Sequence, residues 1–143
     1  MFESADGGGR RFLGRLVGSA CRTGYGLSPL DLCAGCCAYC GVRLDEPYEA
    51  WLNLSVDHVV PTRSVKELGY PAHWVDDLAN VVACCRSCNK FLNGYRVTLP
   101  LPTTEAEFFD VRDSVFLSKR DAAFARHKRE RDWYDAWRSR TSG

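Results

Sequence analysis

The chain has 143 residues, of which 45% are hydrophobic and 12% aromatic, with eight cysteines and a formal net charge of +1. This length and apolar content are typical of one globular domain over residues 1–143, and they exclude a disordered chain. No stretch approaches the roughly twenty apolar residues that a membrane-spanning helix needs. The one candidate export segment, residues 12–20, is short and interrupted by Arg15, so we expect a cytoplasmic protein that does not enter a membrane.

The first thirty residues predict little regular structure. Residues 1–10 are polar and contain a Gly-Gly-Gly-Arg run, so we expect them to be disordered. Residues 11–30 predict a short helix broken by Gly24 and Gly26.

The middle of the chain alternates short extended segments with short helical ones. Apolar and polar side chains alternate from residue 51 onward, which predicts a strand, and a second apolar run follows a long connection. The predicted elements are a strand over 51–58 ended by Pro61, a connection over 62–79 with a helical turn at 64–68, a strand over 80–84, and a helix over 86–94 closed by Gly94.

A helical extension is predicted over residues 103–138, after two prolines. Thr104 and Glu107 have the spacing of a capping box at its start. Several aromatic and β-branched residues then recur at helical spacing and are expected to pack on the core, since such a set packs more often than it stacks on bases. They are Phe108, Val111 and Val115, with Phe124 less regularly and Trp133, Tyr134 and Trp137 near the end.

Charge is distributed unevenly along the chain. Residues 44–78 hold seven acids against two bases, whereas residues 118–140 hold eight bases against four acids. A basic end beside a metal-binding centre suits a polyanionic partner, although a solvated helix face is an equal alternative for the charge run alone.

Two C-x-x-C pairs indicate a structural tetrahedral zinc, because each pair grips the metal with two thiolates. A disulfide framework is the alternative for a secreted protein, and it requires an export signal. The pairing frame is ambiguous, since Cys33 and Cys36 directly precede Cys37 and Cys40, and Cys84 neighbours Cys85 in the pair that Cys88 completes. A second metal at Cys33 and Cys36 stays open, but it lacks an obvious partner pair.

Polar residues between and beside the pairs have no use in a structural zinc site. Asp57 and His58 follow each other, Asn80 precedes the second pair, and Asn89 directly follows it. A histidine near its usual pKa of about 6.5 can take a proton from water at neutral pH. Asp57 is an oxygen ligand suited to Mg²⁺ or Mn²⁺. On a straight strand the two side chains point to opposite faces, so they have different tasks unless the backbone bends.

Taken in order, these elements resemble the HNH nuclease family, whose shared unit is the ββα-metal, or His-Me, finger. The resemblance rests on C-x-Y-C-G at residues 37–41, D-H-V-x-P at 57–61, Asn80, and Asn89 after the second C-x-x-C, and it covers residues 37–94. It implies an α+β fold, a small ββα-metal finger with structural zinc knuckles between N-terminal helices and a longer C-terminal helix. Because Tyr39 and Gly41 match the family knuckle, the implied zinc ligands are Cys37, Cys40, Cys85 and Cys88.

The resemblance also implies roles for the polar residues. His58 would be the general base, Asp57 would bind the catalytic Mg²⁺ or Mn²⁺, and Asn80 would tie down the loop after the first strand. Asn89 takes the last motif position, where many members carry histidine. Asn93 shares its helix face and can add a second amide oxygen, or it is simply the last helical residue before Gly94.

The implied activity is metal-dependent hydrolysis of DNA phosphodiester bonds, leaving 5′-phosphate and 3′-hydroxyl ends, with nicking expected of a monomer. DNA contacts are expected from Arg86, Lys90 and Arg96 and from the basic C-terminal helix. We see no sequence-reading module, so specificity would come from the flanks or a partner protein, in a monomer or homodimer. The alternatives are a non-catalytic zinc module that binds nucleic acid and a redox protein using C-x-x-C. Surface or capping roles are expected for His73 and His127.

Overall fold

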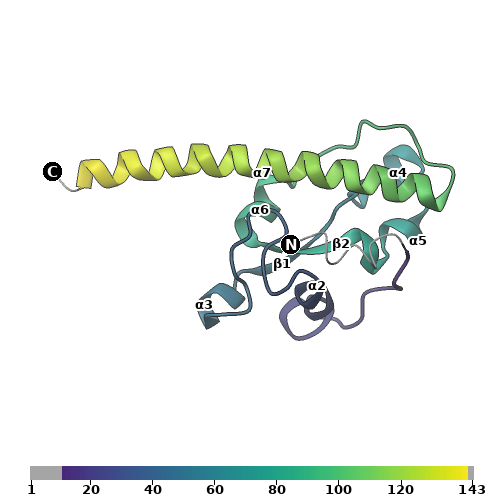
Figure 1. Cartoon of the computed structure of the whole chain (residues 1–143), viewed down its shortest axis with the longest axis horizontal. Helices are drawn as coiled ribbons and strands as arrows, with labels where there is room; N and C mark the ends of the chain where they lie inside the picture. Colours follow the sequence, from purple (N-terminus) through teal and green to yellow (C-terminus); the bar gives the residue numbers. More distant parts are fainter. Residues whose placement is uncertain (1–10, 142–143) are drawn as a thin grey trace.

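The computed structural model describes residues 11–141, so the expectation of disorder over residues 1–10 lies outside the described residues. The chain forms a mixed α/β structure around one two-stranded sheet, with a long helix at its C-terminal end (Figure 1). The elements in chain order are the π-helical turn η1 (Cys21–Tyr25), α2 (Leu27–Leu32), α3 (Tyr48–Trp51), β1 (Leu54–His58), α4 (Arg63–Leu68), α5 (Ala72–Val75), the 3₁₀ turn η2 (Leu78–Asn80), β2 (Val81–Cys85), α6 (Arg86–Phe91) and α7 (Glu105–Thr141).

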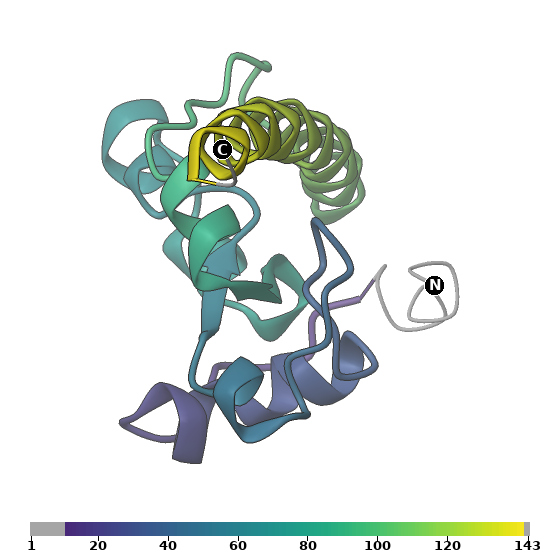
Figure 2. The ribbon, with the colours of Figure 1, turned by 90° about the vertical axis from the view of Figure 1, so that its left-hand side faces the viewer.

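The sheet pairs β1 with β2 in antiparallel fashion, from Leu54 opposite Cys85 to His58 opposite Val81. All five residues of β2 are buried, which is why its sequence is an unbroken apolar run and not an alternating one. Helix α7 covers one side of the sheet and α2 lies on the other (Figures 1 and 2). Since two strands alone are barely stable in water, these helices provide the burial that the sheet needs.

The N-terminal arm is tied to the core through one buried carboxylate. Asp77 accepts hydrogen bonds from the backbone nitrogens of Leu13 and Gly14, at 2.8 and 2.9 Å, and from that of Ala79 at 2.9 Å. The ring of Phe12 packs among the rings of Trp74, Phe108 and Phe109. The arm therefore joins η2 to the start of α7.

The loop that follows β1 is held by the side chain of Asn80. Its Oδ1 accepts from the Val60 nitrogen at 2.9 Å, and its Nδ2 donates to the Val60 and Val75 carbonyls at 3.0 and 2.8 Å. Asn80 is fully buried, so these three bonds satisfy polar groups that water does not reach. The end of β1 is thereby fixed relative to α5 and β2.

Helix α7 begins with a variant of the predicted capping box. The Glu107 nitrogen donates to Thr104 Oγ1 at 3.1 Å, as a capping box requires. The Glu107 carboxylate, however, accepts from the Thr103 nitrogen at 2.7 Å, one residue earlier than in the standard box. These hydrogen bonds to the Thr103 backbone and hydroxyl lower the pKa of Glu107.

The expected packing of α7 is correct for its first half and wrong for its second. Phe108, Val115 and Phe116 are buried, and Val111 packs on the core, but Phe124 is 52% exposed. Every described side chain from residue 131 to residue 140 is exposed, including Trp133, Tyr134 and Trp137. The reason is length, because 37 residues extend about 55 Å, and the helix projects beyond the sheet (Figure 1).

Two predicted boundaries also change. Trp51 belongs to α3 and not to the first strand, because the Trp51 nitrogen donates to the Pro47 carbonyl at 3.1 Å and closes a helical turn. The helix expected over 86–94 ends at Phe91, and Asn93 and Gly94 lie in the following turn. The predicted break at Gly24 is confirmed by its non-helical backbone angles.

None of the helices within residues 11–141 has the length and apolar character needed to cross a membrane.

Replacing Asn80 by alanine should destabilise the protein strongly. The change leaves buried backbone groups of Val60 and Val75 without partners, at about 1–3 kcal/mol for each unpaired group. Asn53→Ala is the matched control, because the exposed side chain of Asn53 donates one hydrogen bond to the Glu49 carbonyl. Urea unfolding of both variants is the measurement, and equal midpoints would contradict the role given to Asn80.

Candidate metal centre and adjacent pocket

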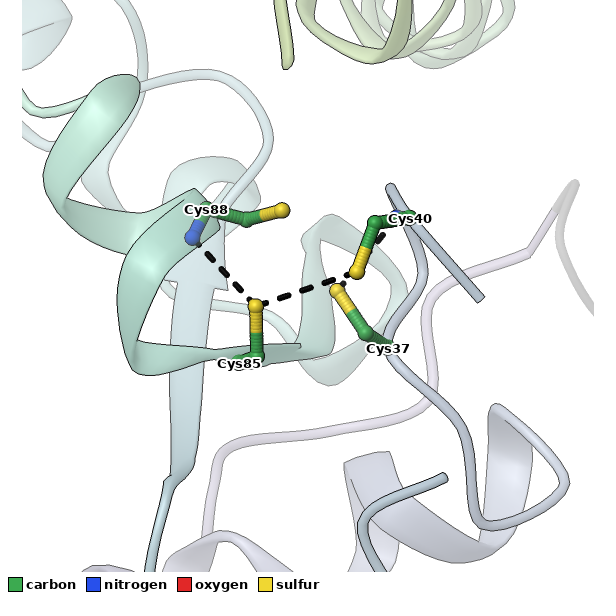
Figure 3. A group of neighbouring side chains, drawn as sticks. All are labelled: Cys37, Cys40, Cys85 and Cys88. Atoms are coloured by element: carbon green, nitrogen blue, oxygen red, sulfur yellow. Dashed lines mark hydrogen bonds between the residues drawn. The ribbon is translucent and has the colours of Figure 1, made fainter. Parts of the chain in front are cut away.

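Four cysteines from two distant segments meet at one point. Cys37 and Cys40 come from the loop before α3, Cys85 ends β2, and Cys88 lies in α6 (Figure 3). Their sulfurs all lie within 4.8 Å of one another. The backbone nitrogens of Cys40 and Cys88 point at the first sulfur of their own pairs, at 3.5 and 3.3 Å.

The spacing of these sulfurs fits a tetrahedral metal. With zinc–sulfur bonds of about 2.3 Å, the edge of a regular tetrahedron is about 3.8 Å. Cys40 Sγ and Cys85 Sγ are 3.8 Å apart. The cluster can therefore hold a structural metal such as zinc.

The overlapping cysteine frame is resolved by this geometry. Cys33 and Cys84 are buried in the core, and burial raises the pKa of both thiols, that of Cys33 to about 11. Cys36 is half-buried and lies outside the four-sulfur group, so within residues 11–141 a second metal at Cys33 and Cys36 gains no support.

A histidine that the sequence did not single out lies against the cluster. His127, from the middle of α7, places its Nε2 3.2 Å from Cys88 Sγ, and its ring contacts Phe91 edge-on. The surface or capping role expected for His127 is therefore wrong. An imidazole N–H at this position can donate to a metal-bound thiolate and orient it. His73, in contrast, is exposed as expected.

The polar residues of the motif surround a separate pocket of about 180 Å³. β1, α4, α6, the turn after α6, and α7 all contribute to its wall. Asp57, His58, Asn89 and Asn93 line it together, along with Tyr95, Arg63 and Lys119. Asp57 and His58 thus reach one pocket although they are neighbours in a strand. Asn80 is not part of this wall, but it holds the adjoining loop through Val60.

Asp57 is engaged by two protein donors. Tyr39, in the first cysteine knuckle, donates its hydroxyl to Asp57 Oδ2, and Lys119 Nζ donates to the same oxygen at 2.8 Å. Lys119 also donates to the His58 carbonyl at 3.0 Å, and its side chain is 1% exposed. Burial, followed by the Asp57 charge, raises the pKa of Tyr39, so its phenol stays protonated.

His58 has the electrostatics of a base. Burial lowers its pKa below the ordinary value, and this outweighs the opposing influence of Asp57 and Asp76. The imidazole is therefore neutral near pH 7 and able to accept a proton.

The two amide side chains differ in their surroundings. Asn89 donates its Nδ2 to Ser55 Oγ at 2.8 Å, which leaves its carbonyl oxygen as the acceptor atom of that amide. Asn93 lies in the turn after α6, and its backbone carbonyl accepts from Arg63 at 2.7 Å. The helical position expected for Asn93 is thus wrong, yet it still faces the pocket.

The three residues expected to contact nucleic acid are all exposed, but they are not equally available. Arg86 and Lys90 lie on α6. Arg96 is bound to both carboxylate oxygens of Glu67, each at 2.7 Å. It would have to leave this ion pair to reach a phosphate.

A second, larger groove of about 1020 Å³ lies between the projecting part of α7 and the cysteine knuckles. Its wall combines basic and aromatic side chains. They include Arg86, Lys128, Arg131, Phe124 and Tyr134. The groove also contains Glu130, whose carboxylate pairs with Arg126 at 2.8 Å.

Sequence patterns gave no direct indication of Tyr39, Lys119 or His127 as partners of the two centres. Lys119 had a usable signal, since it falls at helical spacing between Phe116 and Ala123, both buried. A lysine on the apolar face of a helix indicates a buried ionic partner. His127 follows Ala123 by four residues, so the same helical spacing places it on this face, although it does not identify Cys88 as its partner.

Comparison with protein-family models found none that matches the chain, and searches of curated proteins and of solved structures likewise found no match.

Removing the metal should unfold residues 37–94, because the two knuckles are then no longer joined and the sheet they flank buries little surface. Circular dichroism and thermal melting with and without a zinc chelator measure this effect. Retained secondary structure and melting temperature after complete zinc removal would disprove it. Two neighbouring cysteines provide a matched pair of variants, in which Cys85→Ser should lose zinc while Cys84→Ala retains it.

Proposed function

We propose that the protein is a metal-dependent endonuclease of the HNH type, acting on DNA. The observation that carries the proposal is the pocket in which His58, Asp57, Asn89 and Asn93 meet, next to a four-cysteine centre. The order β1, β2, α6 agrees with the ββα-metal finger that the sequence resembles. A zinc at the four cysteines would be structural, and a reducing cytoplasm would keep these thiols available to it.

The pocket residues suit phosphodiester hydrolysis. His58, neutral near pH 7, would take a proton from the attacking water. Asn80 fixes the loop through Val60, two residues from His58, and so limits the positions of the imidazole. Arg63 and Lys119 place positive charge in the pocket wall, where a phosphate would be attracted.

The oxygen donors of the pocket fit a hard divalent cation. Asp57 and the amide oxygens of Asn89 and Asn93 would hold Mg²⁺ or Mn²⁺, which when bound would stabilise negative charge on the leaving oxygen. Asp57 Oδ2 already accepts two protein hydrogen bonds, so Oδ1 is the oxygen of that carboxylate that remains for an ion.

The groove under the projecting part of α7 supports a nucleic-acid partner. Basic side chains bind phosphates, and exposed aromatic rings offer faces on which bases can stack. Outside the lining of the groove, the Arg126 guanidinium lies 5.4 Å from the ring centres of Phe91 and Trp133, so α7 carries cation–aromatic contacts there as well. A partner protein that supplies sequence specificity is compatible with the same surface.

A non-catalytic zinc module that binds nucleic acid is the second candidate. It would use the cysteines and the basic groove, but it would have no use for a neutral histidine beside the half-buried carboxylate of Asp57. A redox role for the C-x-x-C pairs is less well supported, because the two pairs face each other as one four-sulfur group.

Replacing His58 by alanine should reduce the rate of DNA cleavage by about 10²–10⁴-fold, because the attacking water loses its base. The assay is nicking of supercoiled plasmid by zinc-loaded protein supplied with Mg²⁺ or Mn²⁺. Zinc content and melting temperature should stay unchanged. His73→Ala is the matched control, since His73 is exposed and is not part of the pocket wall, and it should cut at the wild-type rate.

A His58→Ala variant that cuts as fast as the wild type would remove His58 from the role of base. If no variant cuts, and the wild type still binds DNA in a salt-sensitive manner, the binding module replaces the nuclease as the assigned function.

Replacing Lys128 by glutamine should weaken DNA binding and its salt dependence. Each lost phosphate contact lowers the slope of log affinity against log salt by about 0.9 for duplex DNA. Lys66→Gln removes the same charge from an exposed residue of α4 that does not line the groove. It should leave the slope of log affinity against log salt unchanged. Fluorescence anisotropy at several salt concentrations measures both, and equal slopes for the two variants would exclude the groove as a contact surface.

A further inference from the structure

The pocket has an unusual charge for a site that would bind a divalent cation. Within the described part of the chain, its wall holds one carboxylate, Asp57, and two cations, Lys119 and Arg63. The two asparagines contribute no charge. With no substrate present, the pocket therefore carries a net positive charge, which opposes the entry of a free cation.

Lys119 is placed to neutralise Asp57 and cannot easily leave. Its Nζ is 2.8 Å from Asp57 Oδ2 and 3.0 Å from the His58 carbonyl, and its side chain is 1% exposed. The Tyr95 ring lies beside it, with its centre 5.5 Å from Nζ. Tyr39, from the first cysteine knuckle, donates to the same Asp57 oxygen. Tyr39 and Lys119 thus both donate to Asp57 Oδ2, and Lys119 remains close to any ion that binds Asp57 Oδ1.

A surface lysine could move its side chain away from an incoming ion. Lys119 cannot, because its side chain extends from α7 and is buried against β1. Its repulsion is also weakly screened, because buried charges are shielded less than exposed ones. A phosphate would meet the opposite situation, since the charge that repels the metal attracts the anion.

We propose that Lys119 is a positioning residue that makes the pocket bind the phosphate of its substrate first and the divalent cation only together with that phosphate. The inference deepens the proposed nuclease function and rests on it. Arg63 adds to the attraction for the anion, and Asp57, held through Oδ2, offers a single oxygen to the cation once the phosphate has neutralised the positive charge of the pocket.

The test uses two binding measurements on zinc-loaded protein, neither of which depends on cleavage. Mn²⁺ binding is followed by electron paramagnetic resonance without DNA, and duplex DNA binding is followed by anisotropy without Mn²⁺. Lys119→Met, which retains much of the side-chain volume, should bind Mn²⁺ about tenfold or more tightly, because a unit charge within a few ångströms is removed. The same variant should bind metal-free DNA more weakly.

These opposite signs separate the proposal from structural damage, which would weaken both kinds of binding. Lys119→Gln is the second variant, since it keeps a donor for Asp57 but removes the charge, and it should change both affinities in the same directions. Lys66→Met is the control for an exposed lysine and should leave Mn²⁺ affinity unchanged. Melting temperature and zinc content identify variants that remain folded.

Unchanged Mn²⁺ affinity in the folded Lys119 variants would overturn the proposal, and so would a loss of both affinities. The nuclease assignment fails separately. If wild-type protein never cuts DNA while the Lys119 variants gain Mn²⁺ affinity as expected, the charge arrangement stands and the proposed enzymatic activity does not.

Discussion

The four-cysteine centre is the constraint on which the rest of the structure depends. It joins segments 45 residues apart, and it connects the first knuckle to the junction of β2 and α6. A two-stranded sheet has too little buried surface to hold such segments by packing alone. Tyr39 lies inside the first knuckle, between two of the four cysteines. The position of its hydroxyl on Asp57 thus follows from the convergence of the four cysteines, although Tyr39 itself is not one of them.

Helix α7 connects the two centres. Lys119 reaches the pocket, and His127, eight residues later and about 12 Å along the axis, reaches Cys88. The stacking of Phe116 on Tyr39, with ring centres 5.4 Å apart, anchors the helix one turn before Lys119. The same rigid element then continues past the sheet and forms one wall of the basic groove. A displacement of α7 would therefore alter the pocket, the environment of the thiols and the groove together.

Much of the core, but less of the surface, could be predicted from the sequence. Short-range patterns located both strands to within three residues and the start of α7. The four cysteines that converge were selected by the family resemblance, because their spacing alone left two frames open. Long-range contacts were not predictable in this way, because the partners of Asp57 lie 18 and 62 residues away. The aromatic end of α7 was misjudged for a related reason. Helical spacing shows which residues share a face, but it does not show where the underlying sheet ends, and Trp133 and Trp137 extend past that point.

The burial of Lys119 beside Asp57 requires an explanation, because a charged side chain is costly to remove from water. A buried ion pair contributes little net stability, because removing two charges from water costs about as much as their attraction returns. An apolar residue at position 119 would continue the buried face between Phe116 and Ala123 without that cost. A structural explanation alone is therefore weak for this lysine. A charge that is expensive to bury is more readily understood where it acts on something that enters the pocket, and phosphate and divalent metal respond to it in opposite directions.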